Sequence, residues 1–305
     1  MSPAAEPARV RVRVEDRELE LSNLDKVLYP ATGFTKGEVI HYYTAVAPVL
    51  LPHLRDRALT RIRYPDGVDA NSFFEKNAPA ATPDWVRTET LPAPGSTLGR
   101  ATVDYVVADD LPTLVWLANL AAIELHTPQW RVGGDPDLLV IDLDPGAPAG
   151  LPECARVALA VTERLAADGL AALPKLSGRK GMQLAAAVSG TQPADVVSAY
   201  VRGVAEELAR RRPGEVTAAM AKRVRGGRVF LDWSQNNAAK TTVAPYSLRA
   251  GPAPAVSAPL TAAELAALAD GSAPPRPVGP GEALDRAAGG DLWAALLEPG
   301  PPVPI

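Results

Sequence analysis

Residues 138 to 145, Leu-Leu-Val-Ile-Asp-Leu-Asp-Pro, form a short apolar run that ends in two carboxylates. A run of this length, closed by Pro145-Gly146, predicts a buried strand. Positions two apart on a strand share a face, so Asp142 and Asp144 project together, roughly 6 to 7 Å apart along the chain. Two like charges so placed repel each other unless a cation lies between them. The arrangement favours a site for Mg²⁺ or Mn²⁺, and the simpler alternative is a turn capped by aspartates.

Strands and helices alternate after this run. Val229 to Asp232 reads as a further strand that ends in a carboxylate, and the loop Lys175–Gly181 precedes a strand at Met182–Val188. Other predicted elements are a hairpin of Arg9–Glu15 and Glu18–Ser22, a helix opened by a capping box at Thr35 and running toward Leu50, strands at Ala58–Tyr64 and Thr102–Val107, and helices at Leu111–Leu125, Pro152–Asp168, Pro193–Arg211 and from Thr261.

These elements predict one α+β domain of two packed lobes. The 305 residues are enough for a sizeable core. We expect a disordered N-terminus (1–8), an N-terminal lobe (about 9–130), a catalytic lobe (about 131–250), a Pro-rich belt (about 251–295) and a Pro-rich tail (296–305).

Composition excludes several classes of protein. Cys154 is the only cysteine, so an internal disulfide framework and a Cys-based zinc site are excluded. No apolar stretch is long enough for a membrane span and the first residues lack a signal-peptide core, so we expect a cytoplasmic, nucleoid-associated protein. The net charge is −4, yet residues 202–228 carry eight Lys or Arg against three Glu. A local basic face of this kind is sufficient for contacts with phosphate.

Three segments can converge on one site. Asp232 beside Asp142 and Asp144 would complete a three-carboxylate site for two metal ions. The loop Ser177-Gly-Arg-Lys-Gly181 combines flexible glycines, a hydroxyl and two cations, which suits phosphate, although it lacks the spacing of a Walker loop. A basic, polar stretch that suits polyphosphate or a nucleic-acid backbone includes Arg225, Gln235 and Arg249.

Six motifs together resemble the polymerase domain of bacterial ligase D. They are Asn23-Leu-Asp-Lys-Val-Leu-Tyr-Pro30, Phe73-Phe-Glu-Lys-Asn77, Glu124-Leu-His126, Asp142-Leu-Asp-Pro-Gly146, Ser177-Gly-Arg-Lys-Gly181, and Asp232-Trp-Ser-Gln-Asn236 with Thr242-Val-Ala-Pro-Tyr-Ser-Leu-Arg249. That domain belongs to the archaeo-eukaryotic primase superfamily and serves non-homologous end joining. The resemblance implies a two-lobe primase-type fold with an RRM-like catalytic sheet.

The resemblance also implies roles for individual residues. Asp142, Asp144 and Asp232 would bind two Mn²⁺ or Mg²⁺ ions. The nucleotide, an NTP or dNTP, would contact Phe73, Phe74, His126, Ser177, Arg179, Lys180, Gln183, Arg225, Gln235 and Arg249. Asn23, Lys26 and Lys36 would grip the 5′-phosphate of a DNA end or gapped duplex, and the implied partners in trans are Ku and an ATP-dependent DNA ligase.

Two positions depart from the family pattern. Gln183 stands where the loop normally ends with a histidine, and Ile62 replaces a basic residue common in the strand before Tyr64-Pro65. Glutamine can donate a hydrogen bond but cannot be charged. A catalytically weakened paralogue that acts as a DNA-end or Ku-binding module is therefore an alternative to an active polymerase. A phosphatase of the aspartyl-phosphate kind is disfavoured, because Pro145-Gly146 follows the second aspartate.

Overall fold

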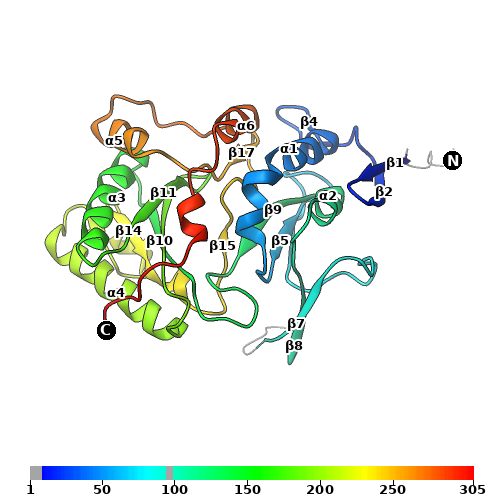
Figure 1. The fold of residues 1–305 in the computed structure, drawn as a ribbon. Coiled ribbons are helices and arrows are strands. Elements are labelled where there is room, and N and C mark those ends of the chain that lie inside the picture. The colour runs from blue at the N-terminus through cyan, green and yellow to red at the C-terminus, as the bar shows by residue number, and fades with distance from the viewer. Residues whose placement is uncertain (1–8, 94–98) are drawn as a thin grey trace.

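The computed structural model describes residues 9–93 and 99–305, and the expected N-terminal disorder over residues 1–8 lies outside them. Figure 1 shows the sheet built around β10 and β14 beside a second region built around β5, β9 and the helices α1 and α2. The chain crosses from the second region to the first after β9 (Ala122–Thr127). It returns through β15 (Thr242–Val243), which pairs with β9.

The catalytic sheet has the strand order of an RRM. It consists of β10 (Leu138–Pro145), β11 (Ala172–Leu176), β12 (Met182–Ala187), β13 (Val216–Thr217) and β14 (Val229–Asp232), in the order β11-β12-β10-β14-β13. The first three strand pairings are antiparallel and the last, between β14 and β13, is parallel. α3 (Leu151–Ala166) and α4 (Ala194–Arg211) provide the two crossovers of a β-α-β-β-α-β unit. The loop predicted at Lys175–Gly181 begins two residues later, at Ser177, because Lys175 and Leu176 still belong to β11.

Alternate residues of β10 face opposite layers. Ile141 and Leu143 are fully buried in the main core, where α3 packs against the sheet. Val140, on the other face, packs against Trp293 and Leu296 of the C-terminal segment. Asp142 and Asp144 follow Val140 at the same two-residue period and therefore project from the face that the two helices do not cover.

The second sheet has the order β15-β9-β5-β6. Its other strands are β5 (Thr60–Arg63) and β6 (Phe73–Glu75), and α1 (Lys36–Leu54) and α2 (Leu111–Asn119) pack beside it. The capping box predicted at Thr35 opens α1: the Thr35 hydroxyl accepts from the Glu38 backbone N–H, while the Glu38 carboxylate accepts from that of Thr35.

The predicted helix over Leu111–Leu125 is wrong in its second half. The helix ends at Asn119, the chain turns at Ala121 with φ of 57°, and β9 follows. β9 lies between β5 and β15 and is buried on both faces, so its apolar residues continue those of α2 without a change of period. His126 consequently stands on a strand and not at a helix end.

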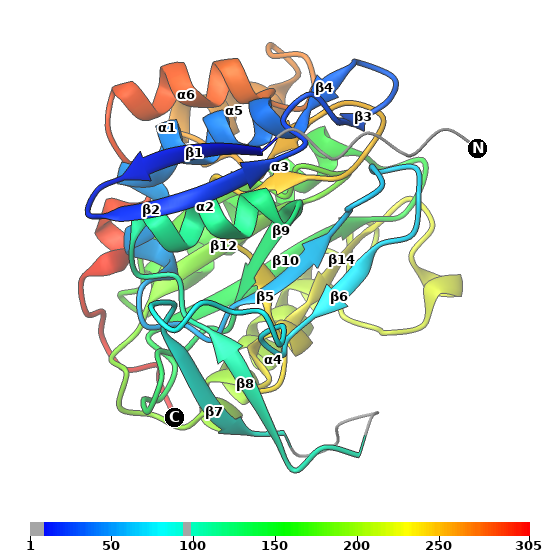
Figure 2. The same ribbon diagram turned by 90° about the vertical axis from the view of Figure 1, so that its right-hand side faces the viewer.

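Short hairpins and bridging strands surround this framework (Figure 2). They are β1 (Arg9–Val14) with β2 (Arg17–Ser22), β3 (Val27–Tyr29) with β4 (Phe34–Thr35), β7 (Thr88–Pro92) with β8 (Thr102–Val106), and β16 (Leu248–Arg249) with β17 (Ala255–Val256). The β7–β8 hairpin extends away from the rest of the molecule in both ribbon views. Two short 3₁₀ helices, η1 (Lys222–Val224) and η2 (Trp233–Asn236), flank β14.

The Pro-rich C-terminal segment packs across the molecule. It contains the predicted α5 (Ala262–Asp270) and also α6 (Pro280–Ala288) and η3 (Ala294–Leu297), which the sequence pattern did not reveal. The final residues are anchored as well: Val303 is 2% exposed, and its backbone N–H donates to Gln192 at 2.7 Å. Of the belt and the loose tail considered for this segment, the structure shows the belt. Among the described residues, no helix is long and apolar enough to cross a membrane.

Candidate active site

Three aspartates meet at the edge of the catalytic sheet. Asp142 on β10 is the cross-strand partner of Asp232 on β14, and Asp144 lies two residues further along β10. Cross-strand partners share a face, so all three carboxylates emerge on the same side. Burial, together with repulsion from Asp232 and Asp144, raises the pKa of Asp142 to about 6, and a hydrogen bond from Gln183 opposes this rise.

The other two carboxylates have polar partners from this chain. Lys180 Nζ lies 2.8 Å and Arg225 Nη1 3.2 Å from the carboxylate oxygens of Asp144. Asp232 accepts from the backbone N–H of Ser234 at 3.0 Å and from Gln235 Nε2 at 2.9 Å. The structure thus brings together most of the cationic and amide residues that the sequence assigned to a nucleotide.

The donor atoms suit a hard divalent cation, but the carboxylates are not gathered around one point. Over residues 9–93 and 99–305, no group of three or more His, Cys, Asp or Glu side chains is arranged to hold a metal ion. The shared face, the oxygen donors and the mutual repulsion at Asp142 fit such an ion. Its binding would require Asp144 to turn from Lys180 and Arg225, so metal binding remains a prediction.

The loop Ser177–Gly181 is shaped by close backbone packing. The Ser177 hydroxyl donates to the carbonyl of Gly181 at 2.9 Å, which closes the loop on itself. Gly178 has φ of 71°, and a Cβ added there would lie 2.5 Å from Cγ of Arg249. A Cβ on Gly181 would lie 2.3 Å from the carbonyl oxygen of Leu143. Both glycines are therefore required, and the loop is held against β10 and Arg249.

The sequence motif Glu124-Leu-His126 did not by itself assign a role to Glu124. Its buried carboxylate lies 3.0 Å from Arg179, 3.0 Å from Arg249 and 3.1 Å from His126. Burial opposes ionisation of this group, but the hydrogen bond with His126 and the charges of Arg249 and Arg179 lower its pKa to about 2. Glu124 thereby fixes cations from the catalytic lobe against β9. On a strand, the two-residue spacing places Glu124 and His126 on the same face, where they can form an ion pair. The sequence analysis did not use this relationship, because it predicted a helix over these residues.

Gln183 is buried beside Asp142 and is held by Lys175. Gln183 and Lys175 are cross-strand partners on β12 and β11, and Lys175 Nζ donates to Gln183 Oε1 at 2.6 Å. Burial lowers the pKa of Lys175 well below its usual value. Direct contact between Gln183 and a nucleotide remains a prediction.

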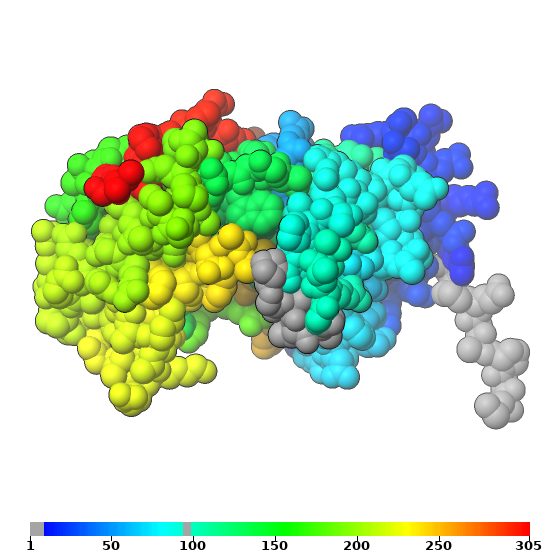
Figure 3. Space-filling model, turned by 90° about the horizontal axis from the view of Figure 1, so that it is seen from below, coloured from blue at the N-terminus to red at the C-terminus, as the bar shows by residue number. Residues whose placement is uncertain are grey.

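Phe73 and Phe74 are not core residues. Their exposed fractions are 51% and 61%, and they are adjacent on the edge strand β6, so their rings point to opposite faces. Phe74 lines a groove of about 1010 Å³ together with Tyr105 and Trp130. The segment 237–241 forms part of the groove wall and is coloured yellow in Figure 3, where it lies close to the cyan N-terminal region.

The three residues predicted to grip a 5′-phosphate are neighbours. The Lys26 backbone N–H donates to the carbonyl of Asn23 at 3.0 Å, and that of Lys36 donates to the carbonyl of Lys26 at 2.8 Å. Burial, with the nearby charges of Lys26 and Arg63, lowers the pKa of Lys36 to about 8. Lys26 is exposed and forms an ion pair with Asp66 at 2.8 Å. Arg63 adds a cation that the sequence did not assign to this cluster.

Ile62 lies beside Glu124 across the strand pair β5–β9. A basic residue at position 62 would therefore face the carboxylate that already pairs with Arg179 and Arg249. Its absence leaves those two arginines as the cations that contact Glu124 in the described residues.

The fold and this site define a primase-polymerase domain. Residues 35–293 match the family described as LigD, primase-polymerase domain, and the chain belongs to that family.

Two curated relatives and one solved structure are similar to this chain. The multifunctional non-homologous end joining DNA repair protein LigD of Mycobacterium tuberculosis is 41% identical over 260 residues, which cover 82% of this chain and 34% of that protein. The bifunctional non-homologous end joining protein LigD of Bacillus subtilis is 33% identical over 245 residues, covering 80% of this chain and 39% of that protein. The chain thus spans little more than a third of these relatives.

The solved structure is the polymerase domain of Mycobacterium tuberculosis ligase D in complex with DNA. It has a TM-score of 0.86 and 40% identity to this chain, and the match covers 94% of this chain and all of that one. The predicted α+β fold of the primase type is therefore confirmed.

Proposed function

We propose that this chain is a nucleotidyltransferase that adds nucleotides, by resemblance ribonucleotides, at DNA ends and gaps during non-homologous end joining. The observation that carries the proposal is the placement of Asp142, Asp144 and Asp232 on one face of the sheet, beside a cationic loop that Glu124 ties to the second sheet. Membership of the primase-polymerase family and the similarity to a DNA-bound polymerase domain support it.

The reaction joins a primer to a nucleotide. The 3′-hydroxyl oxygen of the primer attacks the α-phosphorus, its proton is released, and the bond to pyrophosphate breaks. Two Mn²⁺ or Mg²⁺ ions held by the aspartates would activate the hydroxyl and offset the charge that develops on the phosphates. Lys180 and Arg225, which pair with Asp144 in this structure, would turn to the phosphates when such ions neutralise that carboxylate.

Positioning by this chain would supply most of the remaining rate enhancement. Ser177, Arg179, His126, Gln235 and Arg249 would hold the phosphates and sugar. Phe74 would stack on a base in the groove, since an aromatic face accepts any base. Asn23, Lys26 and Lys36 would hold the 5′-phosphate across the gap.

Partners are proposed on the same basis. Ku and an ATP-dependent DNA ligase, provided in trans, would bring and seal the ends. The alternative of a weakened end-binding paralogue is not favoured, because the family match is joined to a complete set of three aspartates on one face.

The test is primer extension on a 5′-phosphorylated gapped duplex, with Mn²⁺ or Mg²⁺ and with each NTP and dNTP. We expect extension by the parental protein and none by Asp142→Ala or Asp144→Ala. Parental-level extension by either variant, or no extension by the parental protein with any nucleotide, would contradict the proposal.

A further inference from the structure

A continuous polar row crosses the catalytic sheet behind the aspartates. Lys175 on β11 is the cross-strand partner of Gln183 on β12, Gln183 is that of Asp142 on β10, and Asp142 is that of Asp232 on β14. Cross-strand partners share a face, so these four side chains lie side by side on the face that α3 and α4 leave uncovered.

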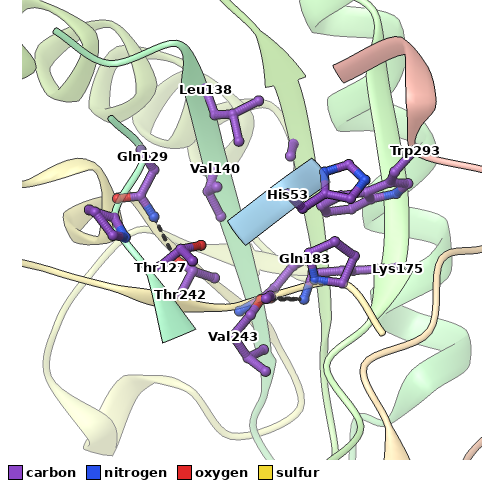
Figure 4. A pocket seen from close by; sticks show the side chains of 14 residues that line it. His53, Thr127, Gln129, Leu138, Val140, Lys175, Gln183, Thr242, Val243 and Trp293 are labelled. Carbon is purple, nitrogen blue, oxygen red and sulfur yellow. Dashed lines mark hydrogen bonds between the residues drawn. The ribbon is translucent and has the colours of Figure 1, made fainter. Parts of the chain in front are cut away.

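Lys175 is almost completely enclosed. It is 1% exposed, and its ammonium lies 5.6 Å from the ring centre of Trp293, which covers this end of the row. Nζ donates to three acceptors: Gln183 Oε1 at 2.6 Å, the carbonyl of Val243 at 3.0 Å, and the hydroxyl of Ser257 at 2.5 Å. Three acceptors match the three protons of an ammonium group. Figure 4 shows the contact with Gln183 beside a small cavity of about 30 Å³.

These contacts fix the direction of the Gln183 amide. The three acceptors around Nζ favour the ammonium form, which can only donate, so the Gln183 oxygen faces Lys175. The amide nitrogen is then directed away from Lys175, and Asp142 is the cross-strand partner of Gln183 on that opposite side, on β10. If the amide were reversed, its oxygen would face a carboxylate and Lys175 would lose an acceptor.

We propose that Lys175 is a positioning residue that acts through Gln183 to orient the carboxylate of Asp142. The pair takes the place of the histidine expected at position 183, because a neutral amide needs an external anchor to present its N–H groups in one direction. At position 183 this chain departs from the family pattern, and Lys175 is the residue that holds the glutamine found there. This inference rests on the proposed function, since it assigns a purpose to the orientation of Asp142.

The test measures Mn²⁺ binding to the nucleotide-free protein by calorimetry, for the parental chain, Lys175→Met, Gln183→Met and the double variant. Loss of a residue that orients a metal ligand lowers metal affinity by roughly 10- to 100-fold. We expect about tenfold weaker binding in each single variant. The double variant should be no weaker than the single variants, because both remove the same support.

Gln129→Met is the matched control. Gln129 is a buried glutamine that lines the same cavity and donates to Thr242 at 2.6 Å, apart from the contact between Lys175 and Gln183 (Figure 4). This variant should lose stability but bind Mn²⁺ with parental affinity. Equal losses of affinity in the control and in Lys175→Met would reduce Lys175 to a structural role.

A second readout does not depend on metal. In NMR spectra of the metal-free protein, the side-chain amide signals of Gln183 should shift and exchange faster with solvent in Lys175→Met.

If Lys175→Met does not fold, parental Mn²⁺ affinity in Gln183→Met would overturn the proposal. Parental protein that binds no Mn²⁺ would overturn the metal site of the proposed function, whereas parental binding with an unchanged Lys175→Met would overturn the positioning role alone.

Discussion

Asp142 and Asp232 stand directly opposite each other on the neighbouring antiparallel strands β10 and β14. Their side chains share one face of the sheet, and burial together with repulsion from Asp232 raises the pKa of Asp142. A pair of facing carboxylates lowers the stability of the metal-free protein, so removal of one of the two charges should not cost stability.

Asp232→Asn should therefore keep the fold and lose activity. Asparagine preserves the cap of η2, where the Asp232 side chain accepts from the backbone N–H of Ser234, while it removes one of two facing charges. We expect an unchanged or slightly higher melting temperature without metal and a loss of nucleotide addition of at least about 100-fold. Asp285→Asn, at an exposed position, is the control and should leave both measurements unchanged.

Glu124→Gln should reveal how strongly one carboxylate holds the site together. The substitution preserves shape but leaves Arg249 and Arg179 without their buried counter-charge. Removing one partner of a buried ion pair costs about 3 to 5 kcal/mol, and we expect the lower end of this range because Arg179 is half exposed.

The pH dependence of this loss has a defined sign. The folded pKa of Glu124, about 2, lies below its usual value of 4.5. The ionised group therefore adds stability that is complete above about pH 4.5 and disappears as pH falls toward 2. Denaturant unfolding of both proteins between pH 7 and pH 2.5 should show a converging difference. A constant difference would show that charge is not the cause.

The sequence predicted the strands and helices of the catalytic lobe because turn residues mark where these elements end. Pro145-Gly146 ends β10, and a helix with a clear 3.6-residue period follows. The sequence failed at 111–125, where α2 and β9 are both buried and the residues between Asn119 and Glu124 are all apolar, so the change of period is not marked. It also could not reveal the role of Lys175, because a lysine before a basic loop reads as solvated until Trp293 and Ser257, more than 80 positions away, cover it.

Gly178→Ala should weaken nucleotide binding through Arg249. The positive φ of Gly178 disfavours any side chain, and the new Cβ would lie 2.5 Å from Cγ of Arg249, so the loop or the arginine must move. We expect the apparent Michaelis constant for nucleotide to rise about tenfold or more, with a smaller change in maximal rate. Gly203→Ala, in open space on α4, is the control and should be neutral or slightly stabilising.

The two adjacent phenylalanines should differ in their effects. Phe74 lines the groove of about 1010 Å³, whereas Phe73 points to the opposite face of β6. Stacking of an aromatic ring on a base contributes about 1 to 3 kcal/mol, so Phe74→Ala should weaken binding of a gapped duplex or nucleotide by about fivefold to 100-fold. Phe73→Ala serves as the comparison. The measurement is a fluorescence-anisotropy titration of each variant with the gapped duplex. A larger loss of affinity for Phe73→Ala would assign the stacking role to Phe73 and not to Phe74.

Recognition of the 5′-phosphate should depend on pH through Lys36. The pKa of Lys36 in the free protein is about 8, lowered mainly by burial. A terminal phosphate becomes a dianion above about pH 6, so the attraction between the two is largest from about pH 6 to 8 and declines as Lys36 loses its proton above that range. The measurement is the ratio of affinities for gapped duplexes with and without the phosphate, at fixed ionic strength from pH 6 to 9.5. Lys36→Arg keeps the charge throughout and should flatten the decline above pH 8. A ratio near one at every pH would show that the cluster of Asn23, Lys26 and Lys36 does not bind the 5′-phosphate.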